Sequence, residues 1–75
     1  MDRVVAVARM RVHLRPQERT VELAGRRTVA RMLRELGILP GTAMVIRDDV
    51  LLLESEIVED DDDVEVRAVI SGGAG

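Results

Sequence analysis

The stretch Val64-Glu65-Val66-Arg67-Ala68-Val69-Ile70, followed by Ser71-Gly72-Gly73, decides the fold. Its inward apolar residues alternate with the others at a period of two, which is the pattern of a β-strand with one buried face. β-Branched residues fill most of the stretch, so we expect this strand to lie in the centre of a sheet. A flexible tail over residues 71–75 would then leave directly from the end of the strand.

The tail carries a glycine pair, Gly72-Gly73. Glycine has no Cβ, so the pair leaves the chain slim and lets its backbone approach another protein closely. Such a tail suits insertion into another protein's active site, where its carboxylate would be activated. On the tail alone, an inert glycine-rich terminus is the alternative.

Residues 4–24 predict a β-hairpin. Apolar residues recur at every second position from Val4 to Leu14, with Arg9, Arg11 and His13 on the other face, and the alternation resumes from Arg19 to Ala24. Pro16 marks the turn between these two strands. The last strand can lie parallel and adjacent to the first one, which would make the sheet mixed.

A short amphipathic helix is predicted next. Thr28 is a suitable N-cap, because its hydroxyl oxygen can accept a hydrogen bond from an N–H of the first turn. Apolar residues then recur at helical spacing, at Val29, Met32, Leu33 and Leu36. Gly37 is expected to end the helix.

Two further strands are predicted over residues 43–47 and 50–53, around a turn at Asp48-Asp49. The run from Leu51 to Leu53 does not alternate, so either both faces are covered or a leucine is exposed at an edge. We expect residues 54–63 to form an acidic loop. The predicted order is β-β-α-β-β-β, an α+β fold with one helix packed on a mixed sheet.

The amino-acid composition excludes several classes of site and of function. The chain has 75 residues, which predicts one domain over residues 1–70, and its 12 Val, 8 Leu, 4 Ile and 4 Met supply an aliphatic core. Cysteine is absent, which excludes disulfides and thiolate metal sites. The lack of aromatic residues and the net charge of −3 argue against direct nucleic-acid binding. No apolar run approaches the roughly 18 residues of a membrane span, so we expect a cytoplasmic protein. We also expect a monomer.

The charged residues are unevenly distributed. All 11 basic residues are arginine, so no lysine amine is present that an activated tail could acylate. Residues 1–47 carry ten arginines and four acids, whereas residues 48–75 carry one arginine and ten acids. The acidic half suits a basic docking surface on a partner.

Four segments stand out in this order: Leu33-Arg34-Glu35-Leu36-Gly37 at the helix end, Met44-Val45-Ile46-Arg47-Asp48-Asp49, Glu59-Asp60-Asp61-Asp62-Asp63-Val64-Glu65-Val66, and the terminal Ala68-Val69-Ile70-Ser71-Gly72-Gly73. In these segments, in element order and in length, the chain resembles the ubiquitin-like β-grasp sulfur carriers of the ThiS/MoaD family. The resemblance runs from about Met10 to Gly73 and implies a β-grasp fold.

Three features depart from the family pattern. Asp61 stands where the family usually has glycine, a position that often needs a positive φ. Residues 1–9 precede the usual start, so either the first strand is longer or translation starts at Met10 instead of Met1. Ala74 and Gly75 follow the glycine pair, which family members normally expose as their C-terminus.

The resemblance implies a carrier that is not itself an enzyme and binds no cofactor. An adenylating enzyme would use ATP to activate the carboxylate of Gly73, the second residue of the Gly72-Gly73 pair. A sulfur donor would then convert this activated carboxylate to a thiocarboxylate. Because Ala74 follows, the chain is expected to be a precursor cleaved after Gly73, for example by a JAMM-type zinc metalloprotease. Two alternatives stay open: a ubiquitin-like modifier joined through Gly73 to lysines of target proteins, and a β-grasp interaction module with an inert tail. The sulfur could serve tRNA thiolation, thiamin or molybdopterin synthesis.

We expect the activating enzyme to dock on the sheet face opposite the helix, near the tail. The candidate contact residues are Val69, Arg67, Leu51, Leu53 and Ser71. No catalytic side chain is predicted, since the only histidine, His13, falls on an exposed strand face. The run Asp60–Asp63 lacks the glycine-bearing loop and distal glutamate of a calcium site, so we expect a solvated turn and no metal.

Overall fold

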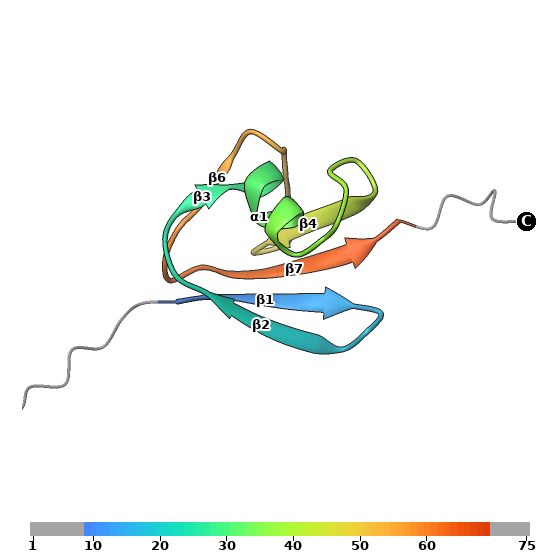
Figure 1. Ribbon diagram of the computed structural model, residues 1–75, viewed down its shortest axis with the longest axis horizontal. Helices are drawn as coiled ribbons and strands as arrows, with labels where there is room; N and C mark the ends of the chain where they lie inside the picture. Colours follow the sequence, from blue (N-terminus) through green and yellow to red (C-terminus); the bar gives the residue numbers. More distant parts are fainter. Residues whose placement is uncertain (1–8, 70–75) are drawn as a thin grey trace, which may run out of the picture.

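A five-stranded mixed sheet with one helix on it forms the body of the protein in the computed structural model, which describes residues 9–69 (Figure 1). The elements are β1 (Met10–Arg15), β2 (Arg19–Leu23), β3 (Arg27–Thr28), α1 (Val29–Glu35), β4 (Ala43–Arg47), β5 (Val50–Leu52), β6 (Ile57–Val58) and β7 (Asp63–Ala68).

The sheet order is β2-β1-β7-β4-β5, with β7 in the middle. β1 and β7 are parallel, and both run toward the same end of the molecule (Figure 1). Val12 lies opposite Val64, and Leu14 lies opposite Val66. The other neighbouring strands are antiparallel. The α+β class, the mixed sheet and the central position of the last strand are therefore confirmed.

The core lies between the sheet and α1. Alternate residues of the strands point toward the helix, because successive side chains of a strand point to opposite faces. The buried apolar side chains are Met10, Val12, Leu14, Val29, Met32, Leu33, Val45, Leu52, Val58, Val64 and Val66. The aliphatic core predicted from composition is thus formed by residues of β1, β4, β5, β6 and β7 and by one side of α1.

Both ends of α1 follow the sequence signals. The Thr28 side chain accepts a hydrogen bond from the backbone N–H of Arg31 at 3.1 Å, as an N-cap does. Gly37 has a φ of +78° just after the last turn, a conformation that glycine adopts without steric cost.

Predicted strand boundaries need correction, and the second strand ends at Leu23 instead of Ala24. Within the described residues the first strand begins at Met10 and not before it, since Arg9 is outside the strand, while Val4–Ala8 lie outside the described residues. The fourth strand ends at Leu52 instead of Leu53. The last strand ends at Ala68, and the predicted end at Ile70 lies outside the described residues.

The prediction of a loop over residues 54–63 was wrong in part, because Ile57–Val58 form β6 and pair with β3. This pairing buries Val58 completely. Two backbone hydrogen bonds tie the same segment to the start of the helix: Val29 N donates to Glu56 O at 2.9 Å, and Ala30 N donates to Glu54 O at 3.0 Å. The first backbone N–H groups of α1, which have no partner inside the helix, are thereby satisfied.

The acidic run is a structural turn. Asp62 accepts a hydrogen bond from Arg47 at 2.6 Å and another from the backbone N–H of Glu59 at 2.8 Å. The positive φ expected at Asp61 is absent; among described non-glycine residues, Glu18, Asp48 and Asp49 have positive φ. Asp61 therefore stands in place of glycine without the left-handed backbone.

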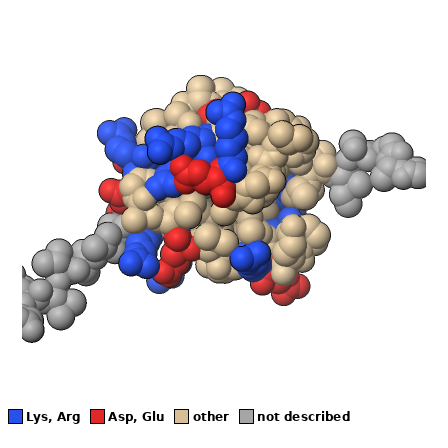
Figure 2. All heavy atoms as spheres, viewed as in Figure 1, with Lys and Arg blue, Asp and Glu red and all other residues tan. Residues whose placement is uncertain are grey.

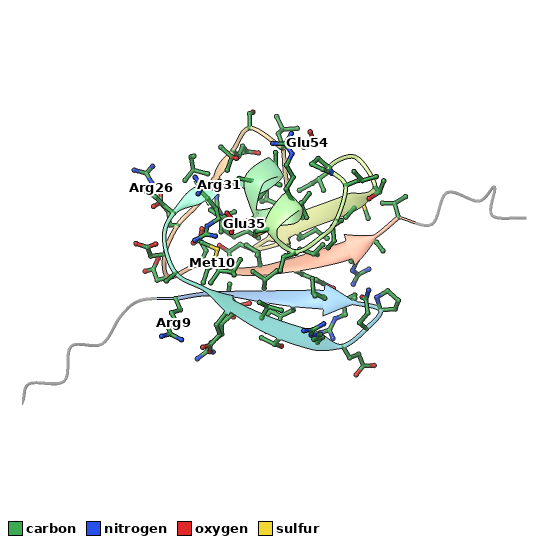
Figure 3. All side chains as sticks on the ribbon, in the orientation of Figure 1. Arg9, Met10, Arg26, Arg31, Glu35 and Glu54 are labelled. Carbon is green, nitrogen blue, oxygen red and sulfur yellow. The ribbon has the colours of Figure 1, made fainter. Side chains whose placement is uncertain are left out.

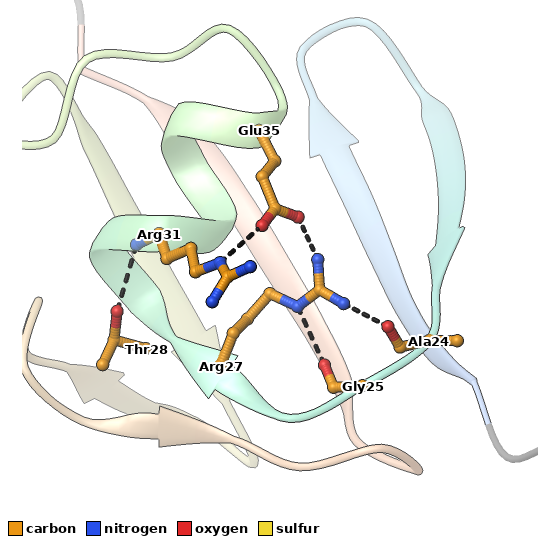
Figure 4. Close-up of polar contacts among 6 residues, drawn as sticks. All are labelled: Ala24, Gly25, Arg27, Thr28, Arg31 and Glu35. Carbon is orange, nitrogen blue, oxygen red and sulfur yellow. Dashed lines mark hydrogen bonds and ion pairs between the residues drawn. The ribbon is translucent and has the colours of Figure 1, made fainter.

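Arg27 closes the connection between β2 and α1 (Figure 4). Its guanidinium donates to the carbonyl oxygens of Ala24 and Gly25 and to the carboxylate of Glu35. Glu35 also accepts from Arg31 at 2.9 Å. Since the Arg27 side chain is only 13% exposed, these bonds fix the helix against the strand that precedes it.

Candidate functional site

The end of β7 carries the chain toward its tail. Val69, the last described residue, donates its backbone N–H to Thr42 O at 2.8 Å, which fixes it to the loop between α1 and β4. The predicted site residues Ser71, Gly72, Gly73 and Ala74 lie outside the described residues.

The sheet face opposite α1, called the open face below, is arranged in rows across the strands. One row reads Thr20, His13, Glu65, Ile46 and Leu51, from β2 to β5. The next row toward the tail reads Arg15, Arg67 and Met44. The register therefore places charged residues on β1 and β7 and apolar ones on β4 and β5.

Glu65 holds the two arginines of the second row. It accepts from Arg67 Nε at 2.8 Å and lies 3.5 Å from Arg15 Nε. The hydrogen bond from Arg67 is the main cause that lowers the pKa of Glu65, and the positive charges of Arg67 and Arg15 add to it, while desolvation partly opposes it.

His13 links three strands of the sheet. Its Nδ1 lies 3.1 Å from Thr20 Oγ1, and its Nε2 lies 2.8 Å from Asp63 Oδ1. The ring is about one-third exposed, and both nitrogens already have partners. These contacts give His13 a role in holding the strands together.

The predicted docking residues that are described lie near the tail end or on the outer edge of the sheet. Val69 is 47% exposed, and strand alternation assigns it to the open face together with Arg67. Leu51 is 55% exposed on the open face of the edge strand β5, whereas Leu53 follows that strand and is 66% exposed. The exposed-edge alternative for the leucine run is therefore correct, with Leu52 in the core.

Sequence reasoning missed Arg15, Met44 and Ile46, which the register brings next to these residues. The signal existed in the alternation of each strand. It could not be used across strands without the pairing of β7 with both β1 and β4.

A cleft of about 590 Å³ lies at the tail end of the sheet, lined by Arg15, Pro16, Glu18, Arg67 and Ala68.

Within residues 9–69, no group of His, Asp and Glu side chains is arranged to hold a metal ion. On the helix side, Figure 2 shows arginines gathered around acidic atoms, and Figure 3 labels Arg26, Arg31 and Glu35 there.

One helix on a five-stranded sheet, with a parallel central pair and a terminal glycine pair in the sequence, defines a ubiquitin-like β-grasp protein. No protein-family model matches the chain. The chain is 42% identical over 65 residues to the sulfur carrier protein TtuB of Thermus thermophilus, a match that covers 85% of this chain and all of the relative. The chain belongs to the ThiS/MoaD-like sulfur carriers, as its sequence resemblance implied.

Sulfur carriers of this kind act as substrates of other enzymes and are not enzymes themselves. Among the described residues, no helix is long and apolar enough to cross a membrane.

Proposed function

We propose that this sulfur carrier transports sulfur as a thiocarboxylate at Gly73. The observation that carries the proposal is the match to a sulfur carrier over the whole length of that relative. In the sequence of this chain, the central strand is followed by Gly72-Gly73. The carboxylate of Gly73 attacks the α-phosphorus of ATP on an adenylating enzyme, and pyrophosphate leaves. A sulfur donor then attacks the acyl carbon, and AMP leaves with the electron pair of the broken bond.

The residues after the glycine pair require an earlier step. Ala74-Gly75 place an amide where the reaction needs a carboxylate. We propose hydrolysis of the Gly73–Ala74 bond by a protease, for which a JAMM-type metalloprotease is the candidate. Intact-mass measurement of the protein from its native cells tests this step. A mature species that retains residues beyond Gly73 would contradict it.

The docking surface of this function comprises Val69, Arg67, Leu51, Leu53 and Ser71. Val69 and Arg67 stand at the end of β7 from which the tail continues, and Leu51 and Leu53 add exposed apolar area at the β5 edge. Exposed apolar side chains beside charged ones suit a transient protein interface.

The experiment uses the chain ending at Gly73, the adenylating enzyme, ATP and sulfide, with intact mass spectrometry as the readout. Replacement of one terminal oxygen by sulfur supports the proposal. A chain ending at Gly72 is the matched control and should stay unmodified. Isopeptide attachment to target lysines without sulfur exchange would instead assign the modifier function, and absence of both products would leave an interaction module.

A further inference from the structure

The main sheet has two edge strands, β2 and β5, and they differ in how open they are to a further strand. Among the described residues, β2 pairs only with β1, and β5 pairs only with β4. β5 has three residues, and the backbone N–H of Leu53, directly after it, donates to the carboxylate of Glu56 at 2.6 Å. β2 has five residues without proline, its register with β1 is continuous, and it lies at the margin of the sheet (Figure 1). Since proline, bulges and short length are the usual protections of a sheet edge, β2 is the more open edge.

The helix side of β2 carries apolar side chains that the core covers incompletely. Val21 and Leu23 lie opposite Val12 and Met10, which are fully buried, so all four side chains point to the core side of the sheet. Val21 and Leu23 pack against the core but are only partly buried. A neighbouring strand with apolar side chains at alternate positions would cover them, and the outer backbone groups of β2 would gain hydrogen-bond partners.

Arg19 adds a positive charge to the same side of β2. It lies opposite Leu14 and is exposed, and within residues 9–69 it forms no ion pair. Its acidic neighbour in sequence, Glu18, lines the cleft at the tail end of the sheet. The acid of the strand itself, Glu22, points to the open face, where it lies 4.0 Å from Arg11. The helix side of β2 therefore presents a cation without a described partner in line with two partly covered apolar side chains.

We propose that β2 binds an extended segment of a partner protein as a further strand of the main sheet. The segment that fits has two apolar residues at alternate positions, over Val21 and Leu23, and an acidic residue at the next alternate position, beside Arg19. Its backbone supplies affinity and its alternate side chains supply specificity, as strand addition generally does. An antiparallel direction continues the pairing of β1 with β2 and gives the order apolar, apolar, acidic along the segment.

This contact goes beyond the sulfur chemistry at Gly73. β1 separates β2 from β7, the strand that leads toward the tail, and β4 and β5 lie on the far side of β7. A strand added at β2 therefore leaves the end of β7 uncovered. One protein can then hold the carrier while another acts on its tail.

The probe is the capped peptide Thr-Val-Thr-Val-Thr-Glu-Thr, titrated into the unaltered chain at low salt and followed through the backbone amide signals in NMR spectra. We expect saturable binding with a dissociation constant of about 1 mM or below. The shifts should be largest in β2 and absent from β5.

N-methylated peptides separate strand addition from a merely apolar contact. Only alternate residues of an added strand direct their N–H groups to the neighbouring strand. One peptide is methylated at the amides of both Val residues, and the other at the amides of the two Thr residues that follow them. We expect one methylation pattern to abolish binding and the other to leave it intact.

The variant Arg19→Glu tests the acidic position. We expect about fivefold weaker binding of the probe, and recovery with a peptide that carries Lys in place of Glu. Arg34→Glu makes the same change in charge at an exposed residue of α1, away from β2, and should bind the probe like the unaltered chain. Thermal unfolding verifies that both variants are folded.

Loss of binding with only one methylation pattern, together with the exchange of charge preference at Arg19, supports the proposal. Absence of saturable binding, equal effects of the two methylations, unchanged binding of folded Arg19→Glu or shifts centred outside β2 each overturn it. Concentration-dependent shifts of β2 amides without peptide would assign the edge to a second copy of this chain, which also overturns it. The proposed function stands or falls separately, through the exchange of oxygen for sulfur at Gly73.

Discussion

Glu65 shows how one side chain organises the open face. It lies between two arginines of adjacent parallel strands, whose like charges would otherwise repel. It thereby fixes both guanidinium groups beside the end of β7, where the chain continues toward its tail.

This arrangement predicts an acid-sensitive contribution to stability. The pKa of Glu65 is lowered in the folded protein, mainly by the hydrogen bond from Arg67, so the folded state binds this proton less tightly than the unfolded state does. The contribution is therefore present above the ordinary pKa of 4.5 and is lost as the pH falls through the lowered folded pKa.

Denaturant unfolding of the unaltered chain and of Glu65→Gln, from pH 7 into the acid range, tests this prediction. The difference in the free energy of unfolding between the unaltered chain and Glu65→Gln should be largest at neutral pH. It should vanish as the pH falls below the ordinary pKa of the Glu65 carboxyl. A gap that stays constant over the whole range would mean that the Glu65 charge contributes nothing.

At the scale of elements, two glycines with positive φ have different surroundings. A Cβ at Gly37 would meet nothing within 4 Å, whereas one at Gly25 would lie 3.1 Å from Arg27 Nη2. Their φ values are +78° and +101°. Only Gly25 thus combines an unfavourable backbone conformation with crowding of the Arg27 contacts.

We expect Gly37→Ala to lower the free energy of unfolding by about 1 kcal/mol, the ordinary cost of a left-handed backbone. Gly25→Ala should cost more, about 2 kcal/mol, because Arg27 must also shift. Chemical denaturation of both variants measures the difference. Equal losses would show that the Arg27 contacts add little to stability.

The elements also show which signals a sequence carries. The helix, the five strands of the main sheet and the Asp48-Asp49 turn were predictable, because each has a local period, cap or breaker. β3 and β6 were not, since a two-residue strand has no period and exists only through its pairing. The Arg47–Asp62 ion pair joins residues distant in sequence, and nothing local distinguishes Asp62 from its acidic neighbours. The open-face docking residues were predictable individually, but their rows depend on the register.

The whole molecule is a small core between one short helix and a sheet, so its stability is expected to be uneven. β1 and β7 have neighbours on both sides and supply five of the buried apolar side chains: Met10, Val12, Leu14, Val64 and Val66. β5 has three residues at an edge, and β3 and β6 have two residues each.

Native-state hydrogen exchange should therefore be slowest for amides of β1 and β7. Exchange should be faster in β5 and in the β3–β6 pair, where local opening disrupts few contacts. Uniform protection across all strands would contradict this order and would indicate that every element opens only in global unfolding.

The parallel pairing of β1 and β7 has a mechanical consequence. β1 starts at one end of the sheet and β7 finishes at the other, so opposing forces on the start of β1 and the end of β7 act along both strands. Such a load shears the backbone hydrogen bonds of this pair together, and no single bond can be peeled away first. A cellular machine that pulls the protein by its C-terminal end must therefore break all the backbone hydrogen bonds between β1 and β7 together.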